Sequence, residues 1–446
     1  MTSWRVEPAR DLAGAVSVPG DKSIGHRAVL FAALTDGVCP VEGLSGGEDN
    51  RRTIAALAAL GVRIEVEPDG TRARVRGVGL DGLRRAGAPL DCGNSGTSMR
   101  LLAGLLAGQG FDTTLVGDEY LTRRPMRRVI EPLAKMGARI TGAPGTKPGE
   151  VYPPLVLGAV DRLDGIAYDL PVASAQVKSA VILAGLRAAG TTTVREPGPT
   201  RDHTERMLAA LGAPIHRPAA GAIVVEPDGW DRRLRAQPFV VPGDPSSSAF
   251  LVAAGILAGS PAGVTVRGVC VNPTRTGFLD ALAAMGARVG VENPRDAGGE
   301  PVADLVAARA TSLRAVELGG ELIVRAIDEV PILAVIAAFA EGTTVVRDAG
   351  ELRVKESDRV ATTVRMLRAF GVEAEELPDG LVVQGGRPLR AGRVESAGDH
   401  RIAMAGAIAA LAADGVSEIA DVANVATSFP SFVALVNELG AEIRAS

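Results

Sequence analysis

Five lysines stand out in this chain of 446 residues, because it holds 48 basic residues and all the others are arginine. Arginine stays protonated and binds oxyanions through a planar fork, whereas lysine is compact and lowers its pKa readily when buried. A lysine kept where arginine is the usual cation is therefore a candidate for charge stabilisation or proton transfer. Lys22, Lys178 and Lys355 lie at predicted helix starts, although an exposed helix face explains Lys178 equally well. Lys135 and Lys147 are expected on the solvated surface.

Three acidic residues also fall at predicted helix starts. Asp328 and Glu329 precede a strongly apolar stretch, and Glu356 lies between Lys355 and Arg359. Each has a structural explanation, since a carboxylate can cap a helix N-terminus and Glu356 can form a charge pair within its own helix. A carboxylate beside cations also stays ionised and can act as a general base. Asp328 and Glu356 are therefore candidates for proton transfer.

The elements that must hold these residues recur along the chain. An apolar eleven-residue pattern occurs six times, with a glycine at its eighth position, at residues 61, 137, 212, 286, 371 and 440. Each copy predicts the end of an amphipathic helix, stopped by the glycine and followed directly by a strand. A period of 69 to 85 residues indicates one supersecondary unit used six times.

A second pattern alternates with the first: a polar start, an Ala- and Leu-rich helix, a glycine and a β-branched run. Its six starts are at residues 23–27, 95–98, 174–178, 246–248, 328–331 and 399–401. Each unit is therefore expected to contain two helices, each followed by a strand, and further short strands. Because a helix N-terminus presents unpaired N–H groups and partial positive charge, twelve such ends suit a multiply anionic ligand.

The repeats also predict the domain organisation. Copy six ends just after its second helix and strand, whereas residues 1–20 resemble strands and have no helix. We expect this N-terminal segment to complete the sheets of the C-terminal half. Copies one to three then form a domain of residues 21–239, inserted into a second domain of residues 1–20 and 240–446. The predicted fold class is α/β, with two domains of three βαβαββ-type units and a ligand cleft between them.

Composition excludes several classes of protein. A net charge of −4, a pI near 5.8 and 3% aromatic residues give neither a basic field nor stacking platforms for nucleic acid. Cys39, Cys92, Cys270 and the four histidines have no disulfide or metal-ligand spacing, so we expect no metal and no cofactor. Cys92 is expected to be a small buried hydrophobic residue. Without a signal sequence or a membrane-spanning stretch, we expect a cytoplasmic monomer that binds neither nucleic acid nor membranes.

Four motifs, in order along the whole chain, resemble signatures of the 5-enolpyruvylshikimate-3-phosphate (EPSP) synthase family, at residues 19–27, 93–100, 353–359 and 399–401. Residues 20–23, 174–178, 201–205 and 272–275 are similar to its bacterial class II branch. The family fold has two inside-out α/β domains of three units each. The family transfers the enolpyruvyl group of phosphoenolpyruvate to the 5-hydroxyl of shikimate 3-phosphate and releases phosphate. Addition and elimination pass through a tetrahedral intermediate, without a metal.

This resemblance implies roles for individual residues. Asp328 corresponds to the general base at the 5-hydroxyl, Glu356 to the carboxylate at the methylene carbon, and Lys22 to a cation that stabilises phosphate charge and assists proton transfer. Shikimate 3-phosphate is expected to bind Lys22, Ser23, Arg27, Ser174, Gln176, Asp328 and Lys355. Phosphoenolpyruvate is expected to bind Lys22, Asn94, Gly96, Thr97, Arg124, Gln176, Arg359 and Arg401. Because both predicted domains contribute residues, closure on the substrates is implied.

Three positions bear on variation within the family. Some members carry a lysine where this chain has Thr427, to which we assign no role. The herbicide glyphosate competes with phosphoenolpyruvate in this family. Gly96 leaves space for it, whereas Leu101 stands where sensitive members usually have proline. We expect competitive inhibition that is weaker than in the proline-bearing enzymes.

Two other functions fit parts of the sequence. The enolpyruvyl transferase that modifies UDP-N-acetylglucosamine has a similar fold, but it uses a mobile-loop cysteine as an acid. This chain has no cysteine at residues 118–125, and its pattern at 355–359 is absent from that enzyme. A non-catalytic repeat scaffold could bind nucleic acid through its helix ends. The acidic pI, the few aromatic residues and the placement of the carboxylates count against it.

Overall fold

The structure is a computed structural model that describes residues 2–145, 148–218 and 221–446. Contacts divide the chain into two compact units. Unit 1 comprises Met1–Pro19, Pro242–Arg295 and Pro301–Ser446, and unit 2 comprises Gly20–Val241 and Asp296–Glu300. The predicted boundaries between domains lie at residues 20 and 240. The prediction assigns residues 296–300 to the C-terminal half, whereas the contacts assign them to unit 2. That the two domains fold independently stays a prediction. Lys147 lies outside the described residues.

The described part of unit 2 contains three four-stranded sheets, a strand pair and six α-helices. In order of pairing, the sheets are β16 (Phe239–Val240), β3 (Val38–Glu42), β5 (Arg72–Arg76) and β4 (Arg63–Val66); β6 (Leu90–Asp91), β7 (Thr113–Val116), β9 (Val151–Gly158) and β8 (Arg139–Pro144); and β11 (Ala167–Asp169), β13 (Thr192–Arg195), β15 (Ile223–Val225) and β14 (Ile215–His216). The pair is β10 (Leu163–Asp164) and β12 (Ala188–Ala189). The helices are α1 (Lys22–Ala33), α2 (Glu48–Ala59), α3 (Gly96–Leu106), η1 (Leu121–Arg123, a 3-10 turn), α4 (Arg127–Lys135), α5 (Ala175–Gly185) and α6 (His203–Ala210).

Unit 1 also has three four-stranded sheets in the residues described. They are β18 (Val289–Ala297), β19 (Glu300–Ala307), β17 (Gly259–Cys270) and β2 (Leu12–Ser17); β20 (Glu317–Leu318), β21 (Thr343–Val346), β23 (Gly380–Gln384) and β22 (Glu373–Leu377); and β24 (Arg393–Glu395), β25 (Ser417–Ala420), β1 (Ser3–Val6) and β26 (Ile443–Ala445). Its helices are α7 (Pro245–Ala258), α8 (Gly277–Ala284), α9 (Gly320–Ala326), η2 (Ile327–Glu329), α10 (Val330–Ala338), η3 (Gly350–Val354), α11 (Arg359–Ala369), α12 (His400–Leu411), α13 (Val425–Ser428) and α14 (Phe432–Glu438).

The six four-stranded sheets share one pattern of pairing. Each has an inner strand that runs parallel to one neighbour and antiparallel to the other; these strands are β3, β7, β13, β17, β21 and β25. A parallel neighbour requires a crossover connection, which runs through α3, α5, α10 and α12 for β7, β13, β21 and β25, whereas the parallel partners of β3 and β17 are distant in sequence. The predicted α/β fold class is confirmed.

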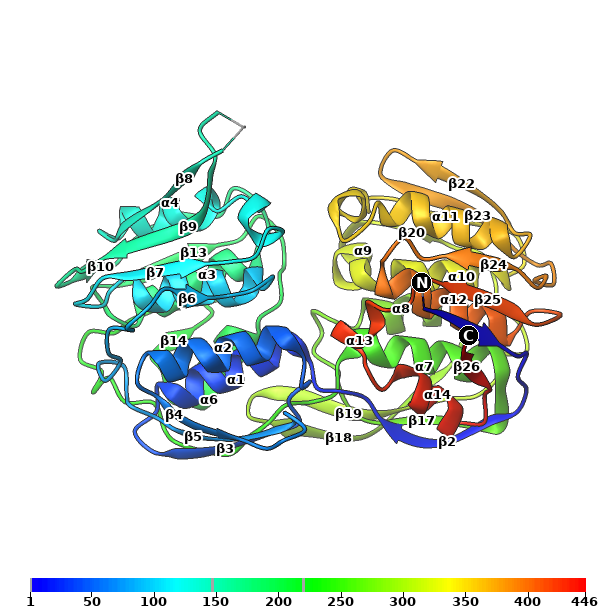
Figure 1. Ribbon diagram of the computed structural model, residues 1–446, viewed down its shortest axis with the longest axis horizontal. Helices are drawn as coiled ribbons and strands as arrows, with labels where there is room; N and C mark the ends of the chain where they lie inside the picture. The colour runs from blue at the N-terminus through cyan, green and yellow to red at the C-terminus, as the bar shows by residue number, and fades with distance from the viewer. Residues whose placement is uncertain (1, 146–147, 219–220) are drawn as a thin grey trace. The chain divides into compact units, whose positions relative to one another are not determined.

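The N-terminal segment contributes strands to two sheets of unit 1 (Figure 1). β1 lies between β25 and β26, antiparallel to both, with Trp4 opposite Ile419 and Ala445. β2 runs parallel to β17 and places Val16 opposite Val266. This is the pairing expected from the strands that copy six lacks.

The six repeated glycines end helices as predicted. They follow α2, α4, α6, α8, α11 and α14, with φ from 79° to 103°. The next strand begins two or three residues after each glycine. Left-handed φ is readily adopted by glycine because it lacks Cβ, so this residue reverses the chain directly from helix into strand.

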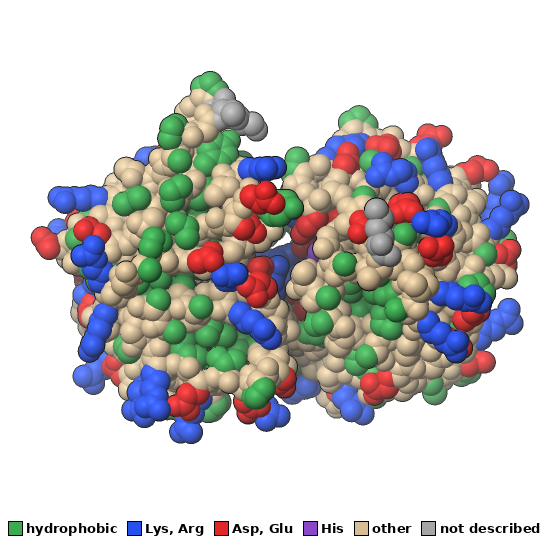
Figure 2. Space-filling view, in the orientation of Figure 1, with side chains coloured by type: hydrophobic (Ala, Val, Ile, Leu, Met, Phe, Trp, Pro, Cys, Tyr) green, Lys and Arg blue, Asp and Glu red, His purple; other side chains and the backbone are tan. Residues whose placement is uncertain are grey.

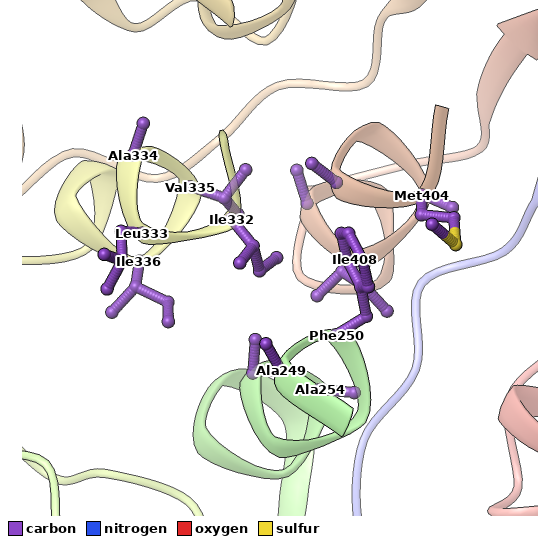
Figure 3. Packing of buried hydrophobic residues seen from close by; sticks show 14 of the residues in the cluster. Ala249, Phe250, Ala254, Ile332, Leu333, Ala334, Val335, Ile336, Met404 and Ile408 are labelled. Carbon is purple, nitrogen blue, oxygen red and sulfur yellow. The ribbon is translucent and has the colours of Figure 1, made fainter. Parts of the chain in front are cut away.

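The helices of the second pattern form the interior. In unit 1, Phe250 of α7, Ile332 of α10 and Ile408 of α12 belong to one buried cluster, seen from close by in Figure 3. A helix that is apolar on all sides must be surrounded by protein, whereas a one-sided helix can cover a surface. α1, α3 and α5 of unit 2 are likewise buried along most of their lengths. In Figure 1 the strands of each unit lie around these helices, the inside-out arrangement.

The surface carries charges of both signs. On the face in view in Figure 2, Lys and Arg side chains are interspersed with Asp and Glu side chains over each unit. None of the helices formed by the described residues combines the length and the hydropathy that spanning a bilayer requires.

Candidate active site

Helix caps hold five of the six polar helix starts in place. The N-cap side chain accepts a hydrogen bond from a backbone N–H two or three residues later at Asp21, Ser95, Ser174, Asp244 and Asp399. Such caps fix the first helical turn, from which the candidate side chains project. The sixth helix, α10, follows Glu329, whose side chain makes no capping bond. Capping therefore does not explain this carboxylate.

Lys22, on the first turn of α1, is paired and still accessible. Its ammonium nitrogen Nζ lies 3.0 Å from Oδ2 of Asp49 on α2, and 54% of its side chain is exposed. Burial alone would raise the pKa of Asp49, but Lys22 and His26 outweigh it and hold that pKa below its ordinary value. Asp49 therefore stays ionised and orients the Lys22 cation. Sequence analysis missed Asp49, for which the acidic pair at 48–49 was the available signal.

The start of α3 collects several residues predicted to bind phosphoenolpyruvate. Arg124 donates from Nη2 to Oδ1 of Asn94 at 2.8 Å. Gln176 of α5 donates from Nε2 to Oγ1 of Thr97 at 2.9 Å, and its Oε1 accepts from Nη1 of Arg100. Amide, hydroxyl and guanidinium groups thus form one polar network in unit 2. Its free N–H groups can bind an anion.

Gly96 allows this network to form, because a side chain there would crowd two cations. A Cβ at Gly96 would lie 2.9 Å from Nη1 of Arg100 and 3.4 Å from Nη1 of Arg124. Arg100 belongs to the motif at residues 93–100, but the sequence assigned it no role. It is buried, with 5% of the residue exposed. Burial, followed by the nearby Arg128 and Arg124, lowers the pKa of Arg100 to about 9.

Arg27 is buried and held by three hydrogen bonds. Its Nε donates to Oγ1 of Thr204 at 2.7 Å, its Nη2 to Oγ of Ser179 at 2.9 Å, and its Nη1 to the carbonyl oxygen of Ser23 at 2.8 Å. Burial lowers the pKa of Arg27 to about 10. A guanidinium has five N–H donors, so two remain for a ligand. Ser174, at the start of α5, caps that helix through Val177 N at 3.4 Å.

In unit 1, three carboxylates surround Arg359, whose side chain is 1% exposed. Its Nε lies 2.8 Å from Asp399, its Nη2 lies 2.5 Å from Glu356, and its Nη1 lies 3.5 Å from Asp328. Nζ of Lys355 lies 3.6 Å from the same Asp328 oxygen. The two candidate proton-transfer groups, Asp328 and Glu356, are thus linked through one buried cation.

Arg401 connects this cluster to a buried acid on η2. It donates from Nη1 to the carbonyl oxygen of Asp328 at 2.9 Å and lies 3.8 Å from Oε1 of Glu329. Burial alone would lower the pKa of Arg401, but Asp328, Glu329 and Asp244 raise it above its ordinary value. Burial raises the pKa of Glu329, which also accepts a hydrogen bond from Ser246. Arg401 therefore stays charged.

The charge state of Glu356 follows from its cationic neighbours. Burial would raise its pKa, but Arg359, His400 and Arg401 lower it below the ordinary value. The adjacent His400 is neutral at neutral pH, because burial and then Arg401 and Arg359 lower its pKa to about 4. Glu356 is therefore a carboxylate at neutral pH, half exposed and fixed by Arg359.

The structure also decides the surface and core assignments. The exposed-face interpretation of Lys178 is wrong, because its side chain is fully buried between Glu196 and Glu205, at 3.0 Å and 2.8 Å. Lys135 is exposed, as expected. Cys92 is buried, as expected, and burial raises the pKa of its thiol to about 12.

The predicted site residues fall into two groups, one in each unit. Unit 2 holds Lys22, Ser23, Arg27, Asn94, Gly96, Thr97, Arg124, Ser174 and Gln176. Unit 1 holds Asp328, Lys355, Glu356, Arg359 and Arg401. Within each group, side-chain contacts join cations to polar or acidic partners. The unit 2 group is thus mainly a preorganised set of donors, whereas the unit 1 group combines cations with two carboxylates.

Residues 6–435 match the family model described as EPSP synthase (3-phosphoshikimate 1-carboxyvinyltransferase). The chain belongs to the EPSP synthase family. A 3-phosphoshikimate 1-carboxyvinyltransferase of Geobacter sulfurreducens is 52% identical, over 98% of this chain and 99% of the relative. Another, of Xanthomonas campestris pv. campestris, is 52% identical over 99% and 98%.

A solved structure of an EPSP synthase agrees with this assignment. An EPSP synthase from Acinetobacter baumannii has a TM-score of 0.92 and 41% identity, with both chains covered completely. The enolpyruvyl transferase NikO from Streptomyces tendae has a TM-score of 0.79 at 22% identity, over 100% of this chain and 99% of that one. The second likeness shows the fold alone.

Proposed function

We propose that this chain transfers the enolpyruvyl group of phosphoenolpyruvate to the 5-hydroxyl of shikimate 3-phosphate and releases inorganic phosphate. The observation that carries the proposal is the cluster in which Arg359 binds both Asp328 and Glu356, beside Lys355 and Arg401. Two carboxylates fixed by cations suit a reaction that moves protons between groups on anionic substrates. Membership of the EPSP synthase family supports the same reaction.

In the proposed addition step, Asp328 accepts the proton of the 5-hydroxyl group. The oxygen of that hydroxyl group forms a bond to C2 of phosphoenolpyruvate at the same time. The methylene carbon C3 takes a proton from the Lys22 ammonium, which gives the tetrahedral intermediate. In the elimination step, the C2–O bond to phosphate breaks and C3 loses a proton. Glu356 is able to accept that proton because its cationic neighbours, first of all Arg359, keep it ionised.

The cations have two proposed tasks. Lys22, Arg124, Arg359 and Arg401 bind phosphoenolpyruvate, and Lys22 also stabilises charge on the departing phosphate. Shikimate 3-phosphate is bound by Ser23, Arg27, Ser174, Gln176 and Lys355. The phosphoenolpyruvate site is flanked by Asn94, Gly96 and Thr97. Donors already held in place stabilise developing charge without reorganising, which is usually a large part of catalysis.

The reaction is tested by a coupled phosphate-release assay. We expect phosphate release with both substrates and none with either substrate alone. Release from phosphoenolpyruvate alone would indicate a phosphatase. Activity with UDP-N-acetylglucosamine in place of shikimate 3-phosphate would favour the other enolpyruvyl transferase.

Substitution of the two carboxylates tests their roles. Asp328→Ala and Glu356→Ala should each lower kcat about a hundredfold or more, the usual effect of losing an acid–base group. Binding of shikimate 3-phosphate should weaken for Asp328→Ala and change little for Glu356→Ala. Glu373→Ala, which removes an exposed partner of Arg387, is the control. Weaker binding with unchanged kcat in both variants would assign both residues to binding alone.

A further inference from the structure

A cluster of four charged side chains, three of them largely buried, lies beside the proposed shikimate 3-phosphate residues in unit 2. Lys178 of α5 lies 3.0 Å from Glu196 and 2.8 Å from Glu205 of α6. Nη2 of Arg217 lies 3.2 Å and 3.3 Å from the same two glutamates. Lys178 is fully buried, whereas 43% of the Arg217 side chain is exposed. The cluster is neutral as a set, with Lys178 as its buried cation.

The cluster is continuous in sequence with the residues that hold Arg27. Ser179 follows Lys178, and Thr204 precedes Glu205; these two hydroxyls accept from the Arg27 guanidinium at 2.9 Å and 2.7 Å. They also bind each other at 2.7 Å. Any shift of α5 against α6 therefore moves the Arg27 guanidinium.

Glu205 also acts on Arg27 electrostatically. Burial lowers the pKa of Arg27, and among the nearby acids Glu205 opposes this most strongly. The second carboxylate oxygen of Glu205, Oε2, is buried and has no hydrogen-bond partner among the described residues. Glu205 therefore has an unused acceptor next in sequence to Thr204, which binds Arg27, and Arg27 has two donors without a partner among the described residues.

We propose that Lys178 is a positioning residue: it neutralises Glu205 and keeps this carboxylate from binding Arg27, which stays available to shikimate 3-phosphate. Without Lys178, the cluster carries two carboxylates and one half-exposed cation. A buried carboxylate without its partner is strongly unfavourable, so Glu205 recruits the Arg27 donors instead. This inference rests on the proposed function, because shikimate 3-phosphate is its ligand.

The test compares four proteins by fluorescence titration with shikimate 3-phosphate and by KM for each substrate. Lys178→Met should raise the Kd for shikimate 3-phosphate about tenfold or more, which corresponds to ~1.4 kcal/mol. The KM for phosphoenolpyruvate should change less. Adding Glu205→Gln should restore the Kd to within about threefold of wild type, because the competing charge is gone. Adding Glu196→Gln instead is the matched control, with the same net charge but Glu205 still ionised, and should not restore it.

Two outcomes would overturn the inference while the proposed function stands. A folded Lys178→Met protein that binds shikimate 3-phosphate as wild type does would overturn it. Equal rescue by both double variants would also overturn it, since cluster charge rather than Glu205 would then matter. If Lys178→Met does not fold, the comparison of the two double variants still decides. Wild-type protein that fails to bind shikimate 3-phosphate would instead overturn the proposed function, and the inference with it.

Discussion

Lys22 and Arg359 illustrate two ways in which this chain holds a cation. Lys22 is half exposed and paired with one carboxylate, whereas Arg359 is buried and surrounded by three. An accessible ammonium group can move as the charge on a substrate changes. A guanidinium group held by three carboxylates keeps one position. Substitutions at Lys22 therefore test chemistry, and substitutions at Arg359 would mainly test geometry.

Lys22→Arg should fold normally and keep a cation near Asp49, yet lose most turnover. The reason is that arginine cannot give up a proton and is less compact at the phosphate. We expect kcat to fall about a hundredfold in the phosphate-release assay at saturating substrates. Lys135→Arg, at an exposed lysine paired with Glu131, is the control. Near-normal turnover would reduce Lys22 to an electrostatic clamp.

His26 makes the stability of unit 2 depend on pH. It is buried, with Nδ1 2.7 Å from Oγ1 of Thr53, and burial lowers its pKa to about 3. In the unfolded chain the imidazole of His26 takes up a proton below about pH 6.5. In the folded chain it stays neutral until the pH approaches 3. Stability is therefore full above pH 6.5 and is lost as pH falls toward 3. At pH 5 the loss relative to pH 7 should be about 2 kcal/mol.

Urea unfolding at pH 7 and pH 5 checks this dependence. Trp4→Phe leaves Trp230 as the single tryptophan, so fluorescence then reports unit 2. In that background His26→Asn, which has no titratable group, should remove most of the difference between the two pH values. If the loss persists in the asparagine variant, another group is responsible.

Helix α3 depends on a missing side chain at its start, Gly96. Gly96 lets the guanidinium groups of Arg100 and Arg124 approach the backbone. A methyl group there would displace the Arg100 guanidinium, contact that of Arg124 and narrow the space beside the proposed phosphoenolpyruvate site. We therefore expect the same helix start to set the position of a cation and to limit the size of an inhibitor at the proposed site.

Gly96→Ala should raise the inhibition constant for glyphosate about tenfold or more, and the KM for phosphoenolpyruvate less, since the inhibitor is the longer molecule. Wild-type protein should be inhibited competitively with phosphoenolpyruvate. Gly110→Ala is the matched control, because a Cβ there meets nothing within 4 Å. If millimolar glyphosate leaves the wild-type rate unchanged at sub-saturating phosphoenolpyruvate, Leu101 outweighs the steric effect of Gly96.

Both ends of the chain meet in one sheet of unit 1. Ser446 N donates to the carbonyl oxygen of Ser3 at 2.9 Å, and the two hydroxyls lie 2.6 Å apart. β1 is an inner strand there, bonded to β25 and β26. An inner strand satisfies backbone groups on both neighbours, so its loss exposes two strand edges.

Deletion of residues 2–7 should destabilise unit 1 strongly, while the same residues attached after Ser446 through a short glycine linker should restore it. In the relocated protein, the linker joins the end of β26 to the start of β1. Because these two strands are antiparallel neighbours, a hairpin turn can span the distance. Thermal unfolding of the deleted and relocated proteins measures this. Full stability of the deleted protein would show that β1 is dispensable.

Features encoded by local chemistry could be predicted from the sequence. The helix ends at Gly61 and its five counterparts follow from glycine's freedom at positive φ, and the apolar interior helices follow from their composition. Polar starts such as Asp21 act as caps because a short side-chain oxygen reaches nearby N–H groups. The family resemblance rests on such polar starts, at residues 19–27, 93–100, 353–359 and 399–401.

Burial and charge pairing required the tertiary structure. The sequence left Lys178 open, because its partners Glu196 and Glu205 lie 18 and 27 residues away and nothing local marks them. Arg100 meets Gln176 across 76 residues in the same way. Whether a charge is solvated or desolvated depends on which distant elements pack around it, and that packing sets the lowered pKa of Arg100.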